Sequence, residues 1–449
     1  MSINKKNIVI LVEHKIRELN PNIFLATKLV KKGFRVYIGN WLSVDRILKH
    51  FDKGFGIILK GGIDNEMLEK VKKKCNAHIV IDQEAGPTKI FSGGIKSRIS
   101  FLNSNNIDKY YALNDNRFKQ AQKEIKFKKK NVLKNFGWPR VDLWKDNNQY
   151  IYQSDIKDLK DKYGKYALYV SNLRHTYVKY YDGFNRFLSS NLEIYNQFNF
   201  SKNQIKIKFS TLKKNSVEKR NSFFSVINFL NFISKANIKV LVRPHFNDDV
   251  EGWKFFTKKI ENIHILDFKN DLHPLIAGCD LFLHSGDASA YQAYLTNKKI
   301  GLIGIKKKNL KKINKHLSEM SQKIYNFKDI GHYLISQKNS KNKEFLKNIK
   351  KHLNYNEKLD ASEKICQDIS RLSIKKQSSI NFQFSTKIIF LIKDYYYFLK
   401  SFFDKKKTIK NPGGIKISEI SSFVKKIEKK KNRNIKTRSV IRNLIEIDI

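Results

Sequence analysis

The chain has few of the residues and runs that define several classes of protein. Its 449 residues include three cysteines, Cys75, Cys279 and Cys366, which stand far apart and form no CxxC pair. A disulfide framework and a zinc knuckle are therefore not indicated, and a reducing cytoplasm fits best. The first apolar run, residues 8–12, is too short for a signal-peptide core and instead predicts a β-strand. We expect no export signal and a cytoplasmic location.

Acidic residues are scarce relative to basic ones. The 41 Asp and Glu face 89 Lys and Arg, which gives a formal net charge of +48 at pH 7. Such an excess favours polyanionic partners: nucleic acid, an acidic membrane surface or phosphorylated substrates. Nucleic acid is the least favoured of the three, because no RNA- or DNA-binding signature accompanies the charge. The hydrophobic share of 41% is enough for the cores of two domains of ordinary size.

Apolar runs alternate with amphipathic helical segments along most of the chain. The apolar positions within each run are continuous rather than alternating, which predicts strands of parallel sheets that are buried on both faces. A polar connection at residues 145–162 separates two such series. We therefore predict an α/β protein with two Rossmann-like domains, residues 1–150 and 151–335, that face each other across a cleft. The predicted strands are residues 7–12, 34–39, 56–60, 77–82, 109–113 and 131–137, then 166–172, 238–245, 263–268, 280–284 and 299–305.

The C-terminal part has a different pattern. Residues 336–449 are polar, Lys-rich and helical in periodicity, and we predict a helical, basic extension. Aromatic and apolar residues gather at residues 387–407, but Lys393, Asp394 and Lys400 interrupt them and exclude a transmembrane span. Two alternatives stay open for this segment: a terminal helix that packs on both domains, or a helix that lies on an anionic membrane surface.

Polar side chains follow four of the predicted strands. The carboxyl ends of parallel strands form the edge at which open α/β sheets bind ligands, so we expect these side chains to line sites there. The alternative for each histidine is a structural role, and for Glu13 it is a helix cap or a surface ion pair. The four groups are Glu13 and His14; Asp82, Gln83 and Glu84; Arg243 and His245; and His284, Gly286, Asp287 and Ser289.

The last of these groups lies in the stretch LFLHSGDASAYQAYL, residues 281–295. A strand here ends in a small, polar turn that contains glycine, and a helix follows. Such a turn aims several backbone N–H groups at one point, and the helix dipole makes that point attractive to an anion. The stretch therefore predicts a phosphate-binding turn.

Several motifs, in this order and spacing, resemble a known family. They are LVEHKIREL, IDQEAG, GWPRVD, VLVRPHFNDDVEGW and CDLFLHSGDASAYQAYLTNKKIGLIG. Together they resemble the bacterial surface carbohydrate biosynthesis proteins and, more loosely, glycosyltransferases that use cytidine nucleotide donors, of the CDP-glycerol polymerase and polysialyltransferase type. The resemblance covers about residues 7–305 and implies the GT-B architecture, with the donor nucleotide held mainly by the second domain.

The resemblance also implies roles for individual residues. Arg243 and His245 would lie near the donor's phosphates, together with a turn that matches His284, Gly286, Asp287 and Ser289. Ser289 would donate its hydroxyl to a phosphate, whereas Asp287, which a phosphate would repel, is expected to cap the following helix. Relatives commonly carry a glutamate that binds ribose where this chain has Gln292, so either ribose recognition is altered or the donor differs.

This reading implies transfer of a sugar or an alditol phosphate, from a donor of the CMP- or CDP-linked kind, to a glycan or lipid-linked acceptor in capsule or lipopolysaccharide synthesis. Arg243 with His245 or His284 would stabilise the departing phosphate, so we expect neither a metal ion nor a further cofactor. The base that activates the acceptor would be Glu84, Glu13 or His14, and Glu84 is favoured because a flexible turn follows it. A lipid-linked acceptor would bring the enzyme to the inner face of the cytoplasmic membrane.

Two other classes of function fit the same features. A nucleotide-sugar 2-epimerase has the same two-domain shape and needs carboxylates and histidines in its cleft, but it needs no acceptor. A non-catalytic polyanion-binding protein would explain the charge and the loss of glutamate at Gln292, and its affinity would fall steeply with salt.

Overall fold

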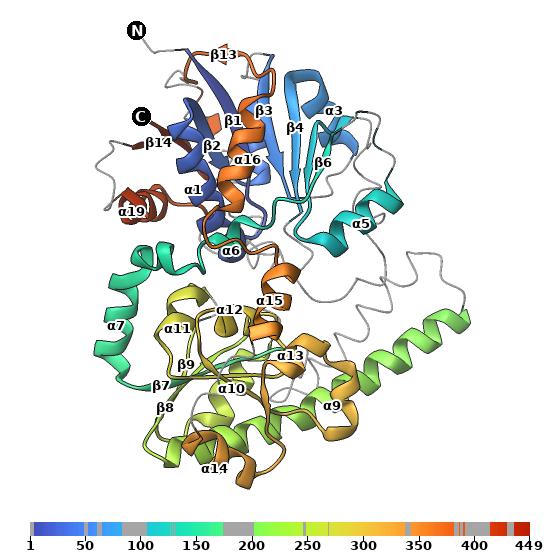
Figure 1. Ribbon diagram of the computed structural model, residues 1–449, viewed down its shortest axis with the longest axis vertical. Coiled ribbons are helices and arrows are strands. Elements are labelled where there is room, and N and C mark those ends of the chain that lie inside the picture. Colours follow the sequence, from blue (N-terminus) through green and yellow to red (C-terminus); the bar gives the residue numbers. More distant parts are fainter. Residues whose placement is uncertain are drawn as a thin grey trace. The chain divides into compact units, whose positions relative to one another are not determined.

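The structure consists of two compact α/β units, each with its own sheet (Figure 1). Unit 1 comprises Met1–Ile151 and Asn342–Ile449, and unit 2 comprises Tyr152–Lys341. The computed structural model describes residues 4–48, 53–60, 65–82, 106–125, 127, 129, 131–173, 202–245, 248–267, 269–336, 343–380, 386, 389, 390, 414–428 and 435–449. The prediction of a mixed α/β protein with parallel, Rossmann-like sheets is confirmed. The facing arrangement across a cleft stays a prediction.

Unit 1 is built on six parallel strands in the order β2-β1-β3-β4-β5-β6. The chain passes from β1 to β2 on one side and then returns to place β3 on the other side of β1. The strand order thus reverses between β1 and β3. The strands are β1 (Lys5–Leu11), β2 (Phe34–Gly39), β3 (Phe55–Leu59), β4 (Cys75–Ile81), β5 (Lys109–Tyr111) and β6 (Leu133–Lys134).

Helices of unit 1 connect these strands, and apolar side chains between the helices and the sheet form its core. Val9, Ile57 and Val80, one from each of three adjacent strands, are fully buried there. The continuous apolar runs of the sequence are explained by this burial on both faces of the sheet. The helices are α1 (Lys15–Lys31), α2 (Trp41–Leu48), α3 (Asn65–Lys74), α5 (Asp115–Glu124) and α6 (Pro139–Asp142), followed by the 3₁₀ helix η2 (Asp146–Tyr152).

The C-terminal residues extend this first sheet and differ from the helical extension predicted for residues 336–449. Strand β15 (Leu444–Asp448) pairs antiparallel with β2, and β14 (Lys436–Ile441) pairs with β15 through a turn at Asn443, where φ is +63°. Strand β13 (Lys376–Gln377) pairs with β1. Leu444 and Ile447 are fully buried against the sheet, which explains why the hairpin joins it. Three helices belong to the same part: α15 (Lys343–His352), α16 (Ala361–Ser370) and α19 (Ile417–Glu428).

The aromatic segment at residues 387–407 lies almost wholly outside the described residues, so the two alternatives predicted for it stay predictions. Of its residues the structure describes Ile389 and Phe390, and Phe390 is 8% exposed and part of the core of unit 1.

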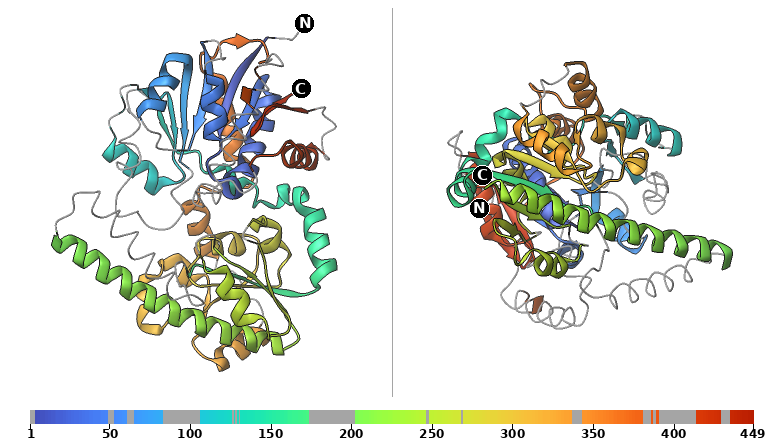
Figure 2. Two further views of the ribbon diagram at one scale, coloured as in Figure 1. Left: turned by 180° about the vertical axis from the view of Figure 1, so that it is seen from behind. Right: turned by 90° about the horizontal axis from the view of Figure 1, so that it is seen from below.

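Unit 2 contains six parallel strands in the order β9-β8-β7-β10-β11-β12, the order of dinucleotide-binding sheets. The order reverses between β7 and β10. Helix α9 (Lys202–Lys235) packs on β8 and β9 and extends well past the sheet (Figure 2). The strands are β7 (Tyr166–Val170), β8 (Lys239–Arg243), β9 (Ile263–Ile265), β10 (Leu281–His284), β11 (Lys299–Leu302) and β12 (Gln322–Lys323). The other helices are α7 (Gln153–Tyr163), α10 (Val250–Thr257), α11 (Leu272–Gly278), α12 (Ala290–Leu295), η3 (Lys307–Lys312), α13 (Lys315–Glu319) and α14 (Phe327–Ile335).

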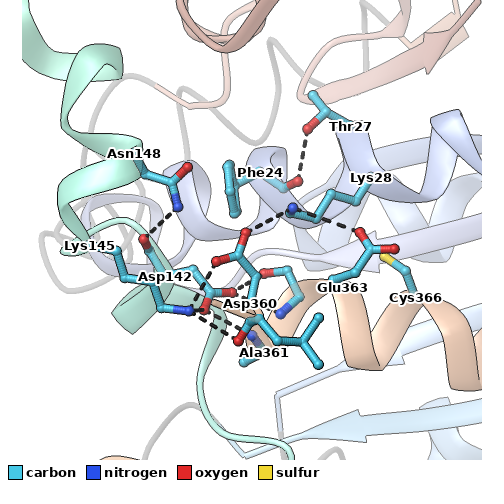
Figure 3. A network of polar contacts seen from close by, with 12 residues as sticks. Phe24, Thr27, Lys28, Asp142, Lys145, Asn148, Asp360, Ala361, Glu363 and Cys366 are labelled. Atoms are coloured by element: carbon cyan, nitrogen blue, oxygen red, sulfur yellow. Dashed lines mark hydrogen bonds and ion pairs between the residues drawn. The ribbon is translucent and has the colours of Figure 1, made fainter. Parts of the chain in front are cut away.

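Within unit 1, a buried polar network attaches helix α16 to the N-terminal part of the chain (Figure 3). Asp142 is the last residue of α6. Its carboxylate accepts hydrogen bonds from the backbone N–H groups of Ala361 and Ser362 at 2.9 and 2.8 Å and from the Ser362 hydroxyl at 2.7 Å. It thereby caps helix α16 from a position 219 residues earlier in the chain. The Lys145 ammonium lies 3.0 Å from both Asp142 and Asp360.

Helix α1 closes the same network from the other side. Lys28 lies 2.9 Å from the second oxygen of Asp360 and 3.8 Å from Glu363. The side chains of Asp142 and Lys145 are 1% and 3% exposed, whereas that of Glu363 is 28% exposed. The buried pair is therefore the part of the network on which the attachment of α16 depends.

We predict that Asp142→Ala lowers the free energy of unfolding of unit 1 by about 3–5 kcal/mol, because it leaves three donors at the start of α16 without their acceptor and leaves the buried Lys145 ammonium with one carboxylate instead of two. Glu363→Gln, which removes the exposed member of the network, serves as the control and should change it by about 0–1 kcal/mol. Denaturant unfolding followed by circular dichroism measures both. A loss for Asp142→Ala no larger than that of the control would contradict this account.

Candidate functional site

At the carboxyl edge of the unit 2 sheet, the strand order reverses between β7 and β10. Two hydrogen bonds connect the segments there: Asn172 Nδ2, after β7, donates to the Gly286 carbonyl at 3.4 Å, and the Tyr169 hydroxyl on β7 donates to Ser285 Oγ at 2.9 Å. Ser285 Oγ in turn donates to the Ile303 carbonyl at 2.9 Å. The turn after β10 is thus fixed to the strands on both of its sides.

Gly286 is required by the shape of this turn. Its φ is +87°, a conformation that residues with a side chain rarely adopt, and a Cβ there would lie 2.9 Å from Ile313 Cδ1. Asp287 Oδ1 accepts hydrogen bonds from the Ser289 backbone N–H at 2.8 Å and from the Ser289 hydroxyl at 2.5 Å. Asp287 thus bonds Ser289, the residue that precedes α12, and its role as a cap of the helix itself stays a prediction. The Ser289 hydroxyl donates to Asp287 here, and its contact with a phosphate stays a prediction.

His284 has a structural position inside the turn. The ring is fully buried, its Nδ1 accepts from the backbone N–H groups of Gly286 and Asp287 at 3.2 Å each, and its Nε2 lies 2.8 Å from Ser321 Oγ. Ser321 Oγ donates to the Leu317 carbonyl, so Nε2 carries the proton and donates to Ser321. Burial lowers the pKa of His284 to about 4, so the ring is neutral at pH 7. It holds the turn together, and the contribution of His284 to stabilising a departing phosphate stays a prediction.

Arg243 places a cation at this edge. It ends β8, the neighbour of β7, and its side chain is largely buried. Burial lowers the pKa of Arg243, and the surrounding carboxylates of Asp287, Asp271, Asp248 and Asp267 counteract this effect. Four carboxylates from three connecting segments thus act electrostatically on one guanidinium.

His245 lies in the loop directly after Arg243, and its backbone N–H donates to Asp248 at 3.1 Å. Strands β8 and β10 both border β7. Because neighbouring strands are about 4.8 Å apart, the ends of β8 and β10 lie about 10 Å from each other. The structure therefore brings the Arg243–His245 segment and the glycine turn to the same edge of one sheet, as the sequence predicts.

Gln292 is buried between two helices of unit 2, and its role toward a ribose stays a prediction. It is 2% exposed, and its amide Nε2 lies 2.8 Å from Nδ1 of His273, a residue of α11. The His273 ring in turn stacks on Tyr152, with centroids 4.0 Å apart. The amide therefore joins α12 to α11 and to the first residue of unit 2. His273 was not singled out by sequence, because it lies inside a short helix and follows no strand.

The carboxyl edge of unit 1 carries a second group of charges. Glu13 Oε2, after β1, lies 2.7 Å from the ammonium of Lys60, which directly follows β3. Lys60 also lies 3.5 Å from Glu18 Oε1, and His14 Nε2 lies 4.0 Å from Glu13 Oε1. Glu13 and His14 were predicted from the sequence. Glu84, the favoured base, lies outside the described residues and stays a prediction.

Sequence reasoning missed both Lys60 and Glu18. Lys60 is the last residue of the apolar run GIILK and precedes two glycines, a position that could have marked it as a strand-end residue. Glu18 lies inside a helix, follows no strand directly and is 2% exposed. Burial raises the pKa of Glu18, and the neighbouring charge of Lys60 opposes this rise. Asp82, also at this edge, is buried and accepts from the Tyr110 hydroxyl at 3.0 Å. Within the described part of the chain, no group of three or more His, Cys, Asp or Glu side chains is arranged to hold a metal ion.

Comparison with known proteins gives matches among solved structures only. No protein-family model and no curated protein matches the chain. UDP-GlcNAc 2-epimerase from Methanocaldococcus jannaschii is 13% identical, with a TM-score of 0.48 over 81% of this chain and 99% of that one. S. aureus MnaA in complex with UDP is 11% identical (TM-score 0.46, 81% and 96%), as is the wall teichoic acid polymerase TagF (0.42, 82% and 87%). At these identities the likeness concerns the fold alone.

We predict that the protein loses stability when the pH falls from about 6.5 toward 4. Burial lowers the pKa of His284 and of His78 to about 4, so the unfolded chain binds protons in this window that the folded chain does not. Each such histidine contributes a slope of about 1.4 kcal/mol per pH unit. His284→Gln keeps an acceptor for the turn but removes one titrating ring, so its free energy of unfolding should fall less steeply. Denaturant unfolding at pH 7, 5.5 and 4.5 measures the slopes, and equal slopes for the two proteins would refute the burial of a neutral ring.

Proposed function

We propose that the chain is a glycosyltransferase-type enzyme of surface polysaccharide synthesis. It would bind a nucleotide-linked donor at the carboxyl edge of unit 2 and transfer a sugar or an alditol phosphate to a glycan or lipid-linked acceptor. The observation that carries this proposal is the placement of Arg243 beside the β7–β10 reversal, next to the turn at Gly286. Open sheets with this strand order bind nucleotides at that point.

The charges around Arg243 favour a particular kind of ligand. A guanidinium offers paired, charged hydrogen bonds to a phosphate, whereas the carboxylates of Asp248, Asp267, Asp271 and Asp287 accept hydrogen bonds from hydroxyl groups. A ligand that carries both a phosphate and many hydroxyls, such as a nucleotide sugar, matches this mixture. A pure polyanion does not, because four carboxylates would repel it. This argues against the polyanion-binding alternative.

The proposed chemistry needs stabilisation of the phosphate that leaves the donor. Arg243 and the backbone N–H groups of the glycine turn would bind the negative charge that develops on it, and the proposal requires no metal ion. His284 would contribute indirectly by holding the turn in shape. His245, in the loop after Arg243, brings a second imidazole to this edge and is proposed as a donor to the same phosphate.

A cytoplasmic enzyme with a lipid-linked acceptor would work at the anionic inner face of the membrane, where the net charge of +48 favours contact. No helix among the described residues is long and apolar enough to span a bilayer. Co-sedimentation with anionic liposomes, but not with neutral ones, would support this location, and equal recovery with both would remove it.

We predict that one of CMP, CDP, UDP and GDP, or its sugar conjugate, raises the melting temperature of the whole protein. Arg243→Ala should abolish this shift, and it should also lower the melting temperature without ligand, because four carboxylates lose their buried cation. Arg220→Ala, which removes an arginine of the same unit on α9, is the control and should keep the shift. A thermal-shift screen measures all three proteins. A shift that survives in Arg243→Ala, or no shift in the wild type with any nucleotide, would contradict the proposal.

Incubation of the wild type with the stabilising sugar nucleotide alone distinguishes an epimerase from a transferase. An epimerase converts the donor sugar without an acceptor and keeps the nucleotide attached. A transferase moves the sugar to an acceptor, or more slowly to water, and releases the free nucleotide.

A further inference from the structure

Three helices of unit 2 pack on the same side of its sheet. Phe223 of α9, Trp253 of α10 and Ile330 of α14 are fully buried. They share one core with Val240 and Val242 of strand β8. Helix α9 also contacts α14 directly. The three helices therefore form one layer, and their outer sides form one surface of unit 2.

The outer side of this layer carries exposed phenylalanine rings in two groups. Phe224 of α9 and Phe255 of α10 both contact Phe256, with ring centroids 5.2 and 5.1 Å apart. Phe232 of α9 stacks on Phe327, the first residue of α14, with centroids 5.2 Å apart. We call the four exposed residues the aromatic face: Phe224, Phe232, Phe255 and Phe327, which are 38%, 38%, 46% and 49% exposed.

The core of the layer does not account for these exposed rings. The same helices bury other aromatic side chains, Phe223, Phe229 and Trp253, so the layer already has its core without the aromatic face. Single apolar residues scattered over a surface are ordinary, but four large rings from three helices of one layer are not scattered. Exposed rings that gather in this way mark a surface that binds a partner.

Lysine side chains accompany the rings. Lys258 Nζ lies 4.9 Å from the centroid of the Phe255 ring. Lys328 directly follows Phe327 at the start of α14. In residues 224–235, 250–261 and 327–335, the lysines are Lys235, Lys254, Lys258, Lys259 and Lys328, all exposed, and the acidic residues are Glu251, Glu261 and Asp329. The aromatic face is therefore flanked by a net positive charge.

We infer that unit 2 binds an anionic lipid surface through the aromatic face. Amphipathic helical surfaces of this composition place aromatic rings at the boundary between headgroups and acyl chains, while their lysines stay at the lipid phosphates. The cations here are lysines, and lysine is depleted at interfaces between proteins. A second copy docked through the same face would bring the lysines of two chains together. A lipid surface therefore fits this face better than a protein partner does.

The inference rests on the proposed function for the reason that the chain is at a membrane, which is the lipid-linked acceptor. It adds which surface of the protein meets the lipid. Binding to vesicles needs neither the donor nor the acceptor, so the inference and the proposed function can be tested separately.

The test is co-sedimentation of the whole protein with vesicles of phosphatidylcholine and phosphatidylglycerol in equal parts. Phe255→Ser combined with Phe327→Ser should lower the partition coefficient by about tenfold or more, because two rings no longer bury apolar surface in the lipid. Lys258→Gln combined with Lys328→Gln should also lower it by about tenfold or more, since each lysine near an anionic surface contributes a factor of about five. Binding of the wild type should weaken as the salt concentration rises.

Leu359→Ser combined with Ile417→Ser is the matched control, because both residues are apolar, 38% exposed and part of unit 1. This variant should bind the vesicles as the wild type does. The melting temperature of each variant without vesicles should stay near that of the wild type, which separates a loss of binding from a loss of folding.

The inference is overturned if the wild type does not bind the anionic vesicles, or if the variant at Phe255 and Phe327 binds them as tightly as the wild type. It is also overturned if sedimentation velocity shows a wild-type dimer that this variant dissociates, because the face would then join two copies of the chain. Vesicle binding through this face without a thermal shift by any nucleotide would uphold the inference and contradict the proposed function.

Discussion

The structure depends on one topological constraint that operates in each unit separately. In a parallel sheet whose strand order reverses, the chain segments after two adjacent strands turn to opposite faces, and the edge between them is left open. In unit 1 this happens between β1 and β3, and in unit 2 between β7 and β10. Polar residues of both units gather at these two places, and the cores on either side of the sheets are apolar.

Each open edge contains a largely buried cation among carboxylates, and the physical reason is shared. Burying a guanidinium or an ammonium without compensation is costly, so Arg243 and Lys60 are surrounded by acidic side chains. The two sites differ in which charge reaches the ligand. In unit 2 the cation ends a strand beside a glycine turn, which suits a phosphate. In unit 1 the cation lies between the carboxylates of Glu13 and Glu18.

The sequence allowed the strands and the edge to be predicted, because a buried parallel strand needs a continuous apolar run and the polar residues after it stand out. Glu13 and Arg243 were found in this way. The sequence did not show which polar residues contact a ligand and which hold the edge together. His284 looked like a ligand-binding residue, but its ring is enclosed by Ser321 and by the turn that it supports. Glu18 was not singled out, because the sequence of a helix does not show which of its acidic residues is buried.

The C-terminal hairpin was missed for another reason. Strand β15 is an antiparallel edge strand in a Lys-rich region, and its partner β2 lies about 400 residues earlier, where no local pattern points to it. The role of Asp142 was missed for the same reason. It caps a helix that begins at Ala361, and nothing near Asp142 in the sequence indicates this partner. Long-range antiparallel pairing and capping across the chain leave almost no local signal.

The central claim is that the carboxyl edge of unit 2, around the β7–β10 reversal, binds a nucleotide. Amide hydrogen exchange with and without the stabilising nucleotide tests it most directly, because it reports on each loop without relying on turnover. The account predicts slower exchange in residues 284–292 and 241–250 when the nucleotide is bound. Binding of the nucleotide with protection confined to other loops, and unchanged exchange at these two, would contradict it.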